Sequence, residues 1–235
     1  MNVDKLCQLA SRYEHVRLLR IPEVVRWLHG DVSFIRDKID MAGIAHKKKN
    51  EILKDAEDRW GRQVMQAKNL DKGQWTGPFG ERVAQELLIL QGLTPMKPIK
   101  KLRYKPDWSV TDRIVEVKTG TFFTTGTAHE KILGAPYKYA DVPELYCKPL
   151  VIWCLGAAER YVREQCDTPS PRQRHLLDKY KEMGITFSYA TDIICTIIEA
   201  ASFPKIRVDI RKKGGGEHEA KEREGEREGE GERLR

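Results

Sequence analysis

The stretch Lys105-Pro-Asp-Trp-Ser-Val-Thr-Asp-Arg-Ile-Val-Glu-Val-Lys118 contains two short segments typical of strands, joined by the pair Thr111-Asp112. Valine, isoleucine and tryptophan favour extended backbone, and aspartate tolerates the unusual dihedral angles of a tight turn. The pattern therefore predicts an antiparallel hairpin centred on this pair. In a hairpin that is symmetric about it, Asp107 on the first strand faces Glu116 on the second.

This hairpin would gather charged side chains on one face. Glu116 and Lys118 share a face because side chains alternate along a strand, while Val115 and Val117 point the other way, into the core. Directly opposed side chains in an antiparallel pair have Cβ atoms about 4.5–5.5 Å apart. Two carboxylates, from Asp107 and Glu116, and the ammonium group of Lys118 should then converge on one patch.

Two carboxylates that close together repel each other, and the repulsion raises the pKa of one of them. A divalent cation removes this cost, and Mg²⁺ suits the group because it binds oxygen ligands and keeps positions for water and substrate phosphate. Lys118 could then orient or deprotonate an attacking water, or stabilise charge that develops on phosphorus. The alternative is a surface hairpin with a salt bridge between Lys118 and a carboxylate. The charge types alone leave both interpretations open.

The flanking sequence predicts an α/β fold. Pro78 at a helix start and Gly92 just past a helix end bracket one helix. Other expected elements are extended segments at about 96–102, 104–110, 113–118, 150–154 and 185–189, and helices at about 171–183 and 192–201. Helices interleaved with strands in this order indicate a mixed central β-sheet flanked by helices.

Residues 1–70 are expected to be helical, since apolar residues recur at helical spacing from Leu6 to Val16 and from Ile52 to Val64. The C-terminal tail is rich in Gly, Glu and Arg, has almost no apolar residue, and is expected to be disordered. We therefore divide the chain into a helical N-terminal region (1–76), a core (77–205) and a charged tail (206–235).

Composition points to a basic intracellular protein. The net charge is +7, and the segment 214–235 contributes −3, so residues 1–213 carry +10, which suits an anionic partner such as nucleic acid. The five cysteines are odd in number and never form a Cys-x-x-Cys pair, which fits the reducing cytoplasm better than a disulfide framework or a zinc site. No apolar run is long enough to span a membrane, and the N-terminus lacks the pattern of a secretory signal.

Pro106-Asp107, followed after eight residues by Glu116-Val117-Lys118, resembles the motif of the PD-(D/E)XK nuclease superfamily. The resemblance covers about residues 77–155 and implies a restriction-endonuclease-like core. It also implies that Asp107, Glu116 and the carbonyl of Val117 bind Mg²⁺, for which Mn²⁺ can substitute, and that Lys118 completes the catalytic set. The helix before the hairpin usually carries an acidic residue in this family, and Glu81 lies there. Glu81 is either an accessory metal or water ligand, or a glutamate favoured near a helix start by the helix dipole.

Within the superfamily, the size and layout most resemble a type II restriction endonuclease. Such an enzyme is a homodimer that hydrolyses double-stranded DNA at a specific sequence and leaves 5′-phosphate ends, with the N-terminal region supplying dimer contacts or clamps on the DNA backbone. Four residues after the catalytic strand are candidate DNA contacts, namely Thr127, Lys131, Tyr137 and Lys138. Thr127 could instead only cap a helix with Glu130, and Tyr137 could only pack. A structure-specific repair or recombination nuclease, and a non-catalytic DNA-binding protein on the same fold, are the alternative functions.

Overall fold

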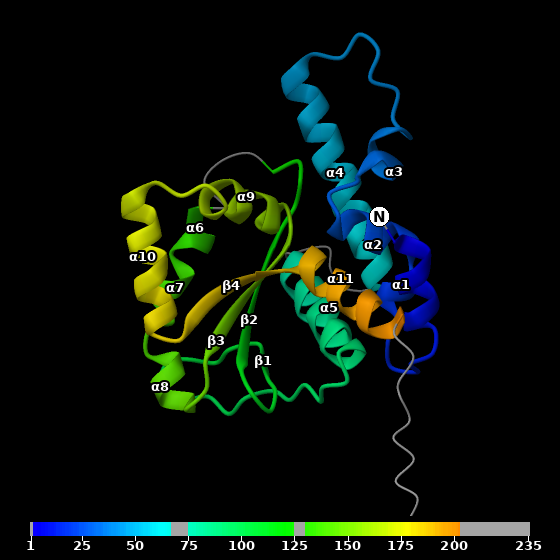
Figure 1. Ribbon diagram of the computed structural model, residues 1–235. Helices are drawn as coiled ribbons and strands as arrows, with labels where there is room; N and C mark the ends of the chain where they lie inside the picture. The colour runs from blue at the N-terminus through cyan, green and yellow to red at the C-terminus, as the bar shows by residue number, and fades with distance from the viewer. Residues whose placement is uncertain (1, 67–74, 125–129, 203–235) are drawn as a thin grey trace, which may run out of the picture. The chain divides into compact units, whose positions relative to one another are not determined.

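A computed structural model describes residues 2–66, 75–124 and 130–202 of the chain (Figure 1). Its centre is a sheet of four strands in the order β1-β2-β3-β4, namely β1 (Trp108–Ser109), β2 (Ile114–Gly120), β3 (Leu150–Gly156) and β4 (Ile185–Tyr189). β1 is antiparallel to β2, whereas β2, β3 and β4 run parallel. The predicted α/β class with a mixed sheet flanked by helices is confirmed.

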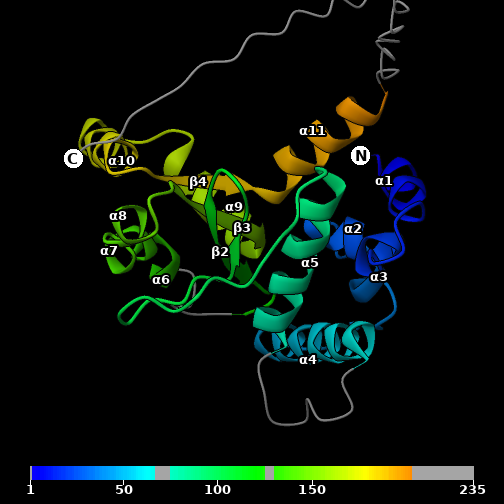
Figure 2. The same cartoon turned by 90° about the horizontal axis from the view of Figure 1, so that it is seen from below.

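Each face of the sheet packs against its own set of helices (Figure 2). On one face the core includes Val115 and Val117 and the helices α1 (Val3–Ala10), α2 (Pro22–Leu28), α5 (Thr76–Leu90) and α11 (Ala190–Ser202). On the other face Ile114 and Ile152 pack with α6 (Glu130–Leu133), α7 (Ala135–Lys138), α8 (Val142–Tyr146) and α9 (Ala157–Cys166). β2 and β3 are therefore buried on both faces, which explains why β3 reads as a continuous apolar run.

Within residues 1–70, which were expected to be helical, the described part is built of helices; the first is shorter than its periodicity predicts and the last is longer. They are α1, the 3₁₀ helix η1 (Leu18–Arg20), α2, α3 (Ser33–Arg36) and α4 (His46–Met65). The helix α1 ends at Ala10. Beyond it, Arg20 holds the chain by donating a hydrogen bond to the carbonyl of Tyr13 at 2.6 Å. Trp27, Trp60, Trp75 and Phe79 pack with ring centroids 5.2–6.1 Å apart. The N-terminal helices thus share one hydrophobic core with α5 and the sheet.

Helix α5 ends where the sequence predicts. Gly92 adopts φ +77°, its N–H donates to Ile89 O (2.9 Å), and the N–H of Leu93 donates to Leu88 O (3.0 Å). These are the two hydrogen bonds of a Schellman motif, which glycine favours because a Cβ penalises a positive φ. The helix begins at Thr76, so Pro78 lies within its first turn rather than at its first residue.

The approach to the hairpin differs from the prediction. The expected strand at 96–102 is wrong, since only isolated bridges occur there, Met96 with Ser109 and Lys101 with Tyr104. The expected strand at 104–110 reduces to β1. Prolines at 98 and 106 explain both results, because proline has no N–H to give to a ladder.

At the C-terminal side, the helix α10 (Pro171–Glu182), the strand β4 and the helix α11 follow the prediction, while α9 was not predicted. The tail and Thr127 lie outside the described residues. Within the described ranges, no helix is both long and apolar enough to cross a membrane.

Candidate active site

The hairpin has the register that the sequence predicts. Trp108 pairs with Val115 and Ser109 with Ile114, and the N–H of Val110 donates to Arg113 O at 3.0 Å. Continuing this register brings Asp107 to the middle of β2, where its Oδ2 accepts a hydrogen bond from the N–H of Val117 at 2.7 Å.

Glu116 lies at the centre of the candidate site and is only 4% exposed. Its Oε1 accepts hydrogen bonds from Lys118 Nζ and from the hydroxyl of Tyr139, the latter at 2.6 Å. Its Oε2 is buried and has no hydrogen-bond partner among the described residues. One oxygen of this carboxylate is therefore held by two donors, and the other has no partner among the described residues.

The other buried glutamates of the described chain provide an internal comparison. Glu57 accepts from Trp27 Nε1 and from backbone N–H groups at Phe122 and Phe123. Glu86 accepts three backbone N–H groups, those of residues 17–19, and Glu159 accepts from Thr191 and Arg163. In these three residues both oxygens have partners, as buried carboxylates normally do. Among the buried glutamates described, an unpartnered oxygen occurs only at Glu116.

Electrostatics at Asp107 agree with this geometry. The pKa of Asp107 is raised to about 6, first by burial and then by the negative charge of Glu116. The N–H of Val117 and the charge of Lys118 lower this pKa, and Glu81 adds a smaller repulsion that raises it. A cation bound beside Asp107 would relieve this repulsion.

The backbone contributes a third oxygen. The N–H of Ile114 donates to Pro149 O, so the backbone groups of Ile114 point toward β3. Backbone groups of successive strand residues point in alternating directions, so those of odd-numbered β2 residues point toward β1. The carbonyl of Val117 consequently faces the same edge as its N–H, which is bonded to Asp107, and β1 does not extend that far. Asp107, Glu116 Oε2 and this carbonyl are hard oxygen donors of the kind that Mg²⁺ binds.

Within the described ranges no group of three or more His, Cys, Asp or Glu side chains could hold a metal ion. The candidate site offers two carboxylates and a backbone carbonyl. Mg²⁺ is often bound by one or two carboxylates with water and substrate phosphate, so these residues have the chemistry of such a site. The bound ion stays a prediction.

Glu81 lies near this group but is engaged elsewhere. Its carboxylate is 2.7 Å from Lys97 Nζ, and Lys97 in turn lies 3.9 Å from the ring centroid of Trp108. Trp108 Nε1 donates to the carbonyl of Glu81 at 2.9 Å, which joins the start of α5 to the residue after Asp107. The Glu81 side chain is 40% exposed, so the ion pair with Lys97 is at the surface.

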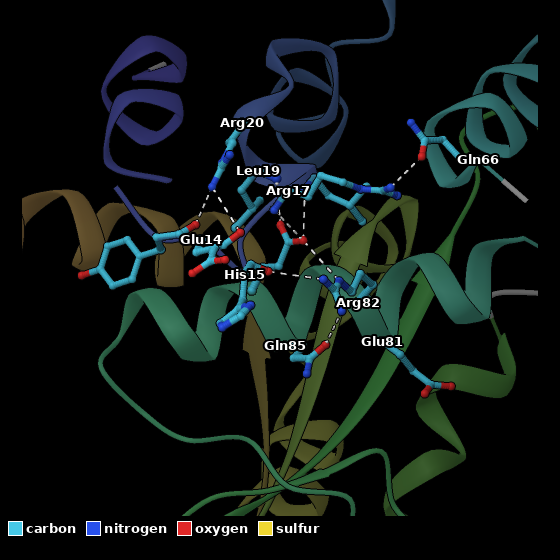
Figure 3. Close-up of polar contacts among 12 residues, drawn as sticks. Glu14, His15, Arg17, Leu19, Arg20, Gln66, Glu81, Arg82 and Gln85 are labelled. Atoms are coloured by element: carbon cyan, nitrogen blue, oxygen red, sulfur yellow. Dashed lines mark hydrogen bonds and ion pairs between the residues drawn. The ribbon is translucent and has the colours of Figure 1, made fainter. Parts of the chain in front are cut away.

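Beside Glu81 an open groove of about 560 Å³ is lined by three cations, Arg17, Arg82 and Lys97, together with apolar and neutral side chains such as Met65 and Trp108. Figure 3 shows how its wall is built: Arg82 donates to the carbonyl of His15 and to buried Glu86, and Arg17 donates to Gln66 Oε1 at 2.8 Å. Because Glu86 also accepts the N–H groups of residues 17–19, η1 is fixed against α5. The N-terminal region therefore places cations next to the candidate site.

The predicted DNA contacts within the described residues lie on α6 and α7, which cover the face of the sheet opposite to α5. Lys131 on α6 and Tyr137 and Lys138 on α7 are exposed, Tyr137 by 83%. Lys138 Nζ lies 4.9 Å from the ring centroid of Tyr139, the residue whose hydroxyl bonds Glu116. Sequence analysis missed Tyr139, since no spacing links it to the hairpin.

No family model, no curated protein and no solved structure matches this chain.

Proposed function

We propose that this protein is a Mg²⁺-dependent endonuclease of the PD-(D/E)XK type that hydrolyses phosphodiester bonds of double-stranded DNA on a restriction-endonuclease-like core. One observation carries the proposal: Asp107 lies beside Glu116, a buried carboxylate with one oxygen unpartnered. The same face of the strand carries Lys118. Exposed cations on α7 (Lys138) and in the N-terminal region (Arg17) support an anionic polymer as the substrate.

In the proposed mechanism, Asp107, Glu116 Oε2 and the carbonyl of Val117 would hold the ion. When bound, Mg²⁺ supplies positive charge that polarises a phosphoryl oxygen and lowers the pKa of water. Lys118 is held by Glu116 Oε1 and directs its remaining protons toward the attacking water and the charged phosphate oxygens. Water oxygen bonds to phosphorus as the bond to the 3′ oxygen breaks. The water gives up a proton to solvent and the departing 3′ oxygen takes one up from solvent, which leaves a 5′-phosphate and a 3′-hydroxyl.

Tyr139 has a positioning role in this scheme. Its hydroxyl donates to the oxygen of Glu116 that also accepts from Lys118, and its ring centroid lies 5.5 Å from Lys118 Nζ. Burial, followed by the contact with Glu116, raises the pKa of Tyr139, so the hydroxyl keeps its proton and remains a donor. Tyr139 therefore holds Glu116 with Oε2 turned toward the ion.

The finer part of the proposal is a homodimeric, sequence-specific enzyme of the type II restriction class. A palindromic DNA site presents the same contacts twice, so two copies of one chain related by a two-fold axis can each cut one strand. The Arg17 side of the groove then serves as a clamp on the DNA backbone, in keeping with the role we expect of the N-terminal region.

The test is cleavage of a supercoiled plasmid by the full-length protein in Mg²⁺ and in EDTA. We expect nicked and linear products only with Mg²⁺, and none from Asp107→Asn or Lys118→Met. The matched control is Asp112→Asn, because this carboxylate lies in the hairpin turn, is 61% exposed and pairs with Arg113. It should cut like the wild type.

The pattern of products separates the alternatives. Discrete fragments from a long defined DNA indicate a restriction-type enzyme, and their ends give the site and stagger. A smear, or cutting only at junctions and flaps, indicates a structure-specific repair or recombination nuclease. Intact DNA with every divalent ion, despite binding, contradicts the endonuclease proposal and leaves a non-catalytic DNA-binding protein.

A further inference from the structure

The segment 96–105, just before Asp107, exposes apolar and basic side chains together. Three large apolar residues of this segment face solvent, Met96 (60% exposed), Ile99 (84%) and Leu102 (75%). Five cations accompany them and are also exposed, namely Lys97, Lys100, Lys101, Arg103 and Lys105. The segment contains no acidic residue. Exposed apolar residues surrounded by cations indicate a surface that meets a polyanion with apolar parts.

The segment is held firmly to the body of the protein. The hydroxyl of Tyr146 donates to the carbonyls of Ile99 (2.8 Å) and Tyr104 (3.2 Å), and Lys101 Nζ donates to Leu145 O at 2.6 Å. Lys101 and Tyr104 exchange backbone hydrogen bonds at 3.0 and 2.9 Å, which closes a turn with Leu102 and Arg103 at its tip. The apolar tip is therefore presented in one conformation.

A leucine at position 102 does not stabilise this turn. Its φ is +52°, a region that costs a residue with a Cβ about 1–2 kcal/mol, and that glycine or asparagine occupies more readily. It also exposes three quarters of its side chain to water. Since neither its backbone nor its burial favours leucine, the side chain is better explained by a contact made outside the folded chain.

The turn is joined to the candidate site through two aromatic rings. Tyr104, next to the tip, packs against Tyr139 with centroids 6.1 Å apart, and Tyr139 bonds Glu116. Arg103 donates to the hydroxyl of Tyr104 at 2.7 Å and also interacts electrostatically with Tyr137. The turn is thus adjacent to the residues that hold Glu116.

We propose that the turn 101–104 is a DNA-contacting wedge, in which Leu102 enters the minor groove while Arg103 and the neighbouring lysines contact phosphates. Proteins that bind the minor groove commonly insert an apolar side chain between base steps and flank it with cations. The inference rests on the proposed function, because it assumes that double-stranded DNA lies across Glu116. It adds a binding element that the hairpin motif does not contain, and it implies that bound DNA is bent.

The test uses Leu102→Asn, which accepts the left-handed backbone but removes the apolar contact. DNA affinity of the full-length protein is measured by fluorescence anisotropy with Ca²⁺ in place of Mg²⁺, on a duplex taken from the plasmid of the cleavage assay. We expect Kd to rise about tenfold, the order expected for one lost leucine contact, while the melting temperature stays the same or rises. Arg103→Gln should make the slope of log K against log salt less negative by about 0.9, as for one lost phosphate contact.

The control is Leu176→Gln, which replaces a leucine that is 51% exposed on α10, the helix that packs beside β4 at the other edge of the sheet. It should leave affinity unchanged. Wild-type affinity in Leu102→Asn, or a clear fall in its melting temperature, overturns the wedge while cleavage by the wild type still supports the nuclease. A wild-type protein that binds no duplex at all removes the proposed function and the wedge together.

Discussion

Replacing Asp107 by asparagine should stabilise the metal-free protein, although Asp107 is central to the proposed chemistry. The charged carboxylate is partly buried beside Glu116, and among the described residues its hydrogen-bond donor is the N–H of Val117. An asparagine carbonyl can accept that hydrogen bond without carrying a charge. The substitution therefore removes a partly buried charge and its repulsion from Glu116 and keeps the contact with β2.

The magnitude follows from the pKa of Asp107, which rises from 3.8 to about 6 on folding. The folded protein binds this proton more tightly than the unfolded chain, so the stabilising contribution is complete below pH 3.8 and is lost as pH rises to about 6. Two pKa units correspond to about 3 kcal/mol of lost stability above that pH. Asparagine does not ionise, so the variant should exceed the wild type by up to this amount at pH 8.

The assay is thermal unfolding followed by circular dichroism at pH 8 in EDTA, with the same pair compared at pH 4. For a chain of this size, about 3 kcal/mol corresponds to a rise in melting temperature of roughly 6–12 °C. The rise should shrink at pH 4, and Mg²⁺ should stabilise the wild type but not the variant. A variant that is equally or less stable at pH 8 would refute the reasoning, because ionised Asp107 would then be a structural group with favourable partners.

Two further substitutions test how the site is supported. Tyr139→Phe keeps the ring but removes the hydrogen bond to Glu116, so Mg²⁺ affinity should fall about 10- to 100-fold, as for other partners of metal ligands. Titration with Mn²⁺ by electron paramagnetic resonance measures this without cleavage, and unchanged affinity contradicts the positioning role. Gly80→Ala would bring a Cβ to 1.8 Å from Thr119 Oγ1, forcing α5 away from β2, and should cost about 1–3 kcal/mol in urea unfolding. Thr119→Ala in the same chain should restore most of that loss, and failure to do so would show that the clash is not the cause.

The parts of the site that the sequence predicts are local. The register of the hairpin follows from a turn pair and from strand alternation, and both involve residues close in sequence to Asp107 and Glu116. β3 was predicted because a parallel strand buried on both faces must be apolar throughout. The end of α5 was predicted because a Schellman motif requires a residue such as Gly92 that tolerates a positive φ.

The contacts that the sequence does not reveal join residues far apart in the chain. Tyr139 lies 23 residues along the chain from Glu116. Glu57 lies 65 residues from Phe122, whose N–H donates a hydrogen bond to it. A glutamate that caps backbone amides and one that awaits a ligand are identical as letters, and only their partners distinguish them. The exposed turn at Leu102 was missed for a related reason, since apolar residues alternating with lysines suggested a strand whereas the prolines prevent one.

A salt bridge between Lys118 and a carboxylate, the structural alternative to a metal site, accounts for only part of this geometry. It explains Glu116 Oε1, which accepts from Lys118. It does not explain why Glu116 Oε2 is buried without a partner, or why a second carboxylate, Asp107, is held close enough to raise its own pKa. A hairpin selected only for stability would be better served by a neutral residue at 107, and the asparagine variant measures by how much. The proposed cation would account for both features at once, because it would neutralise Asp107 and provide the missing partner of Glu116.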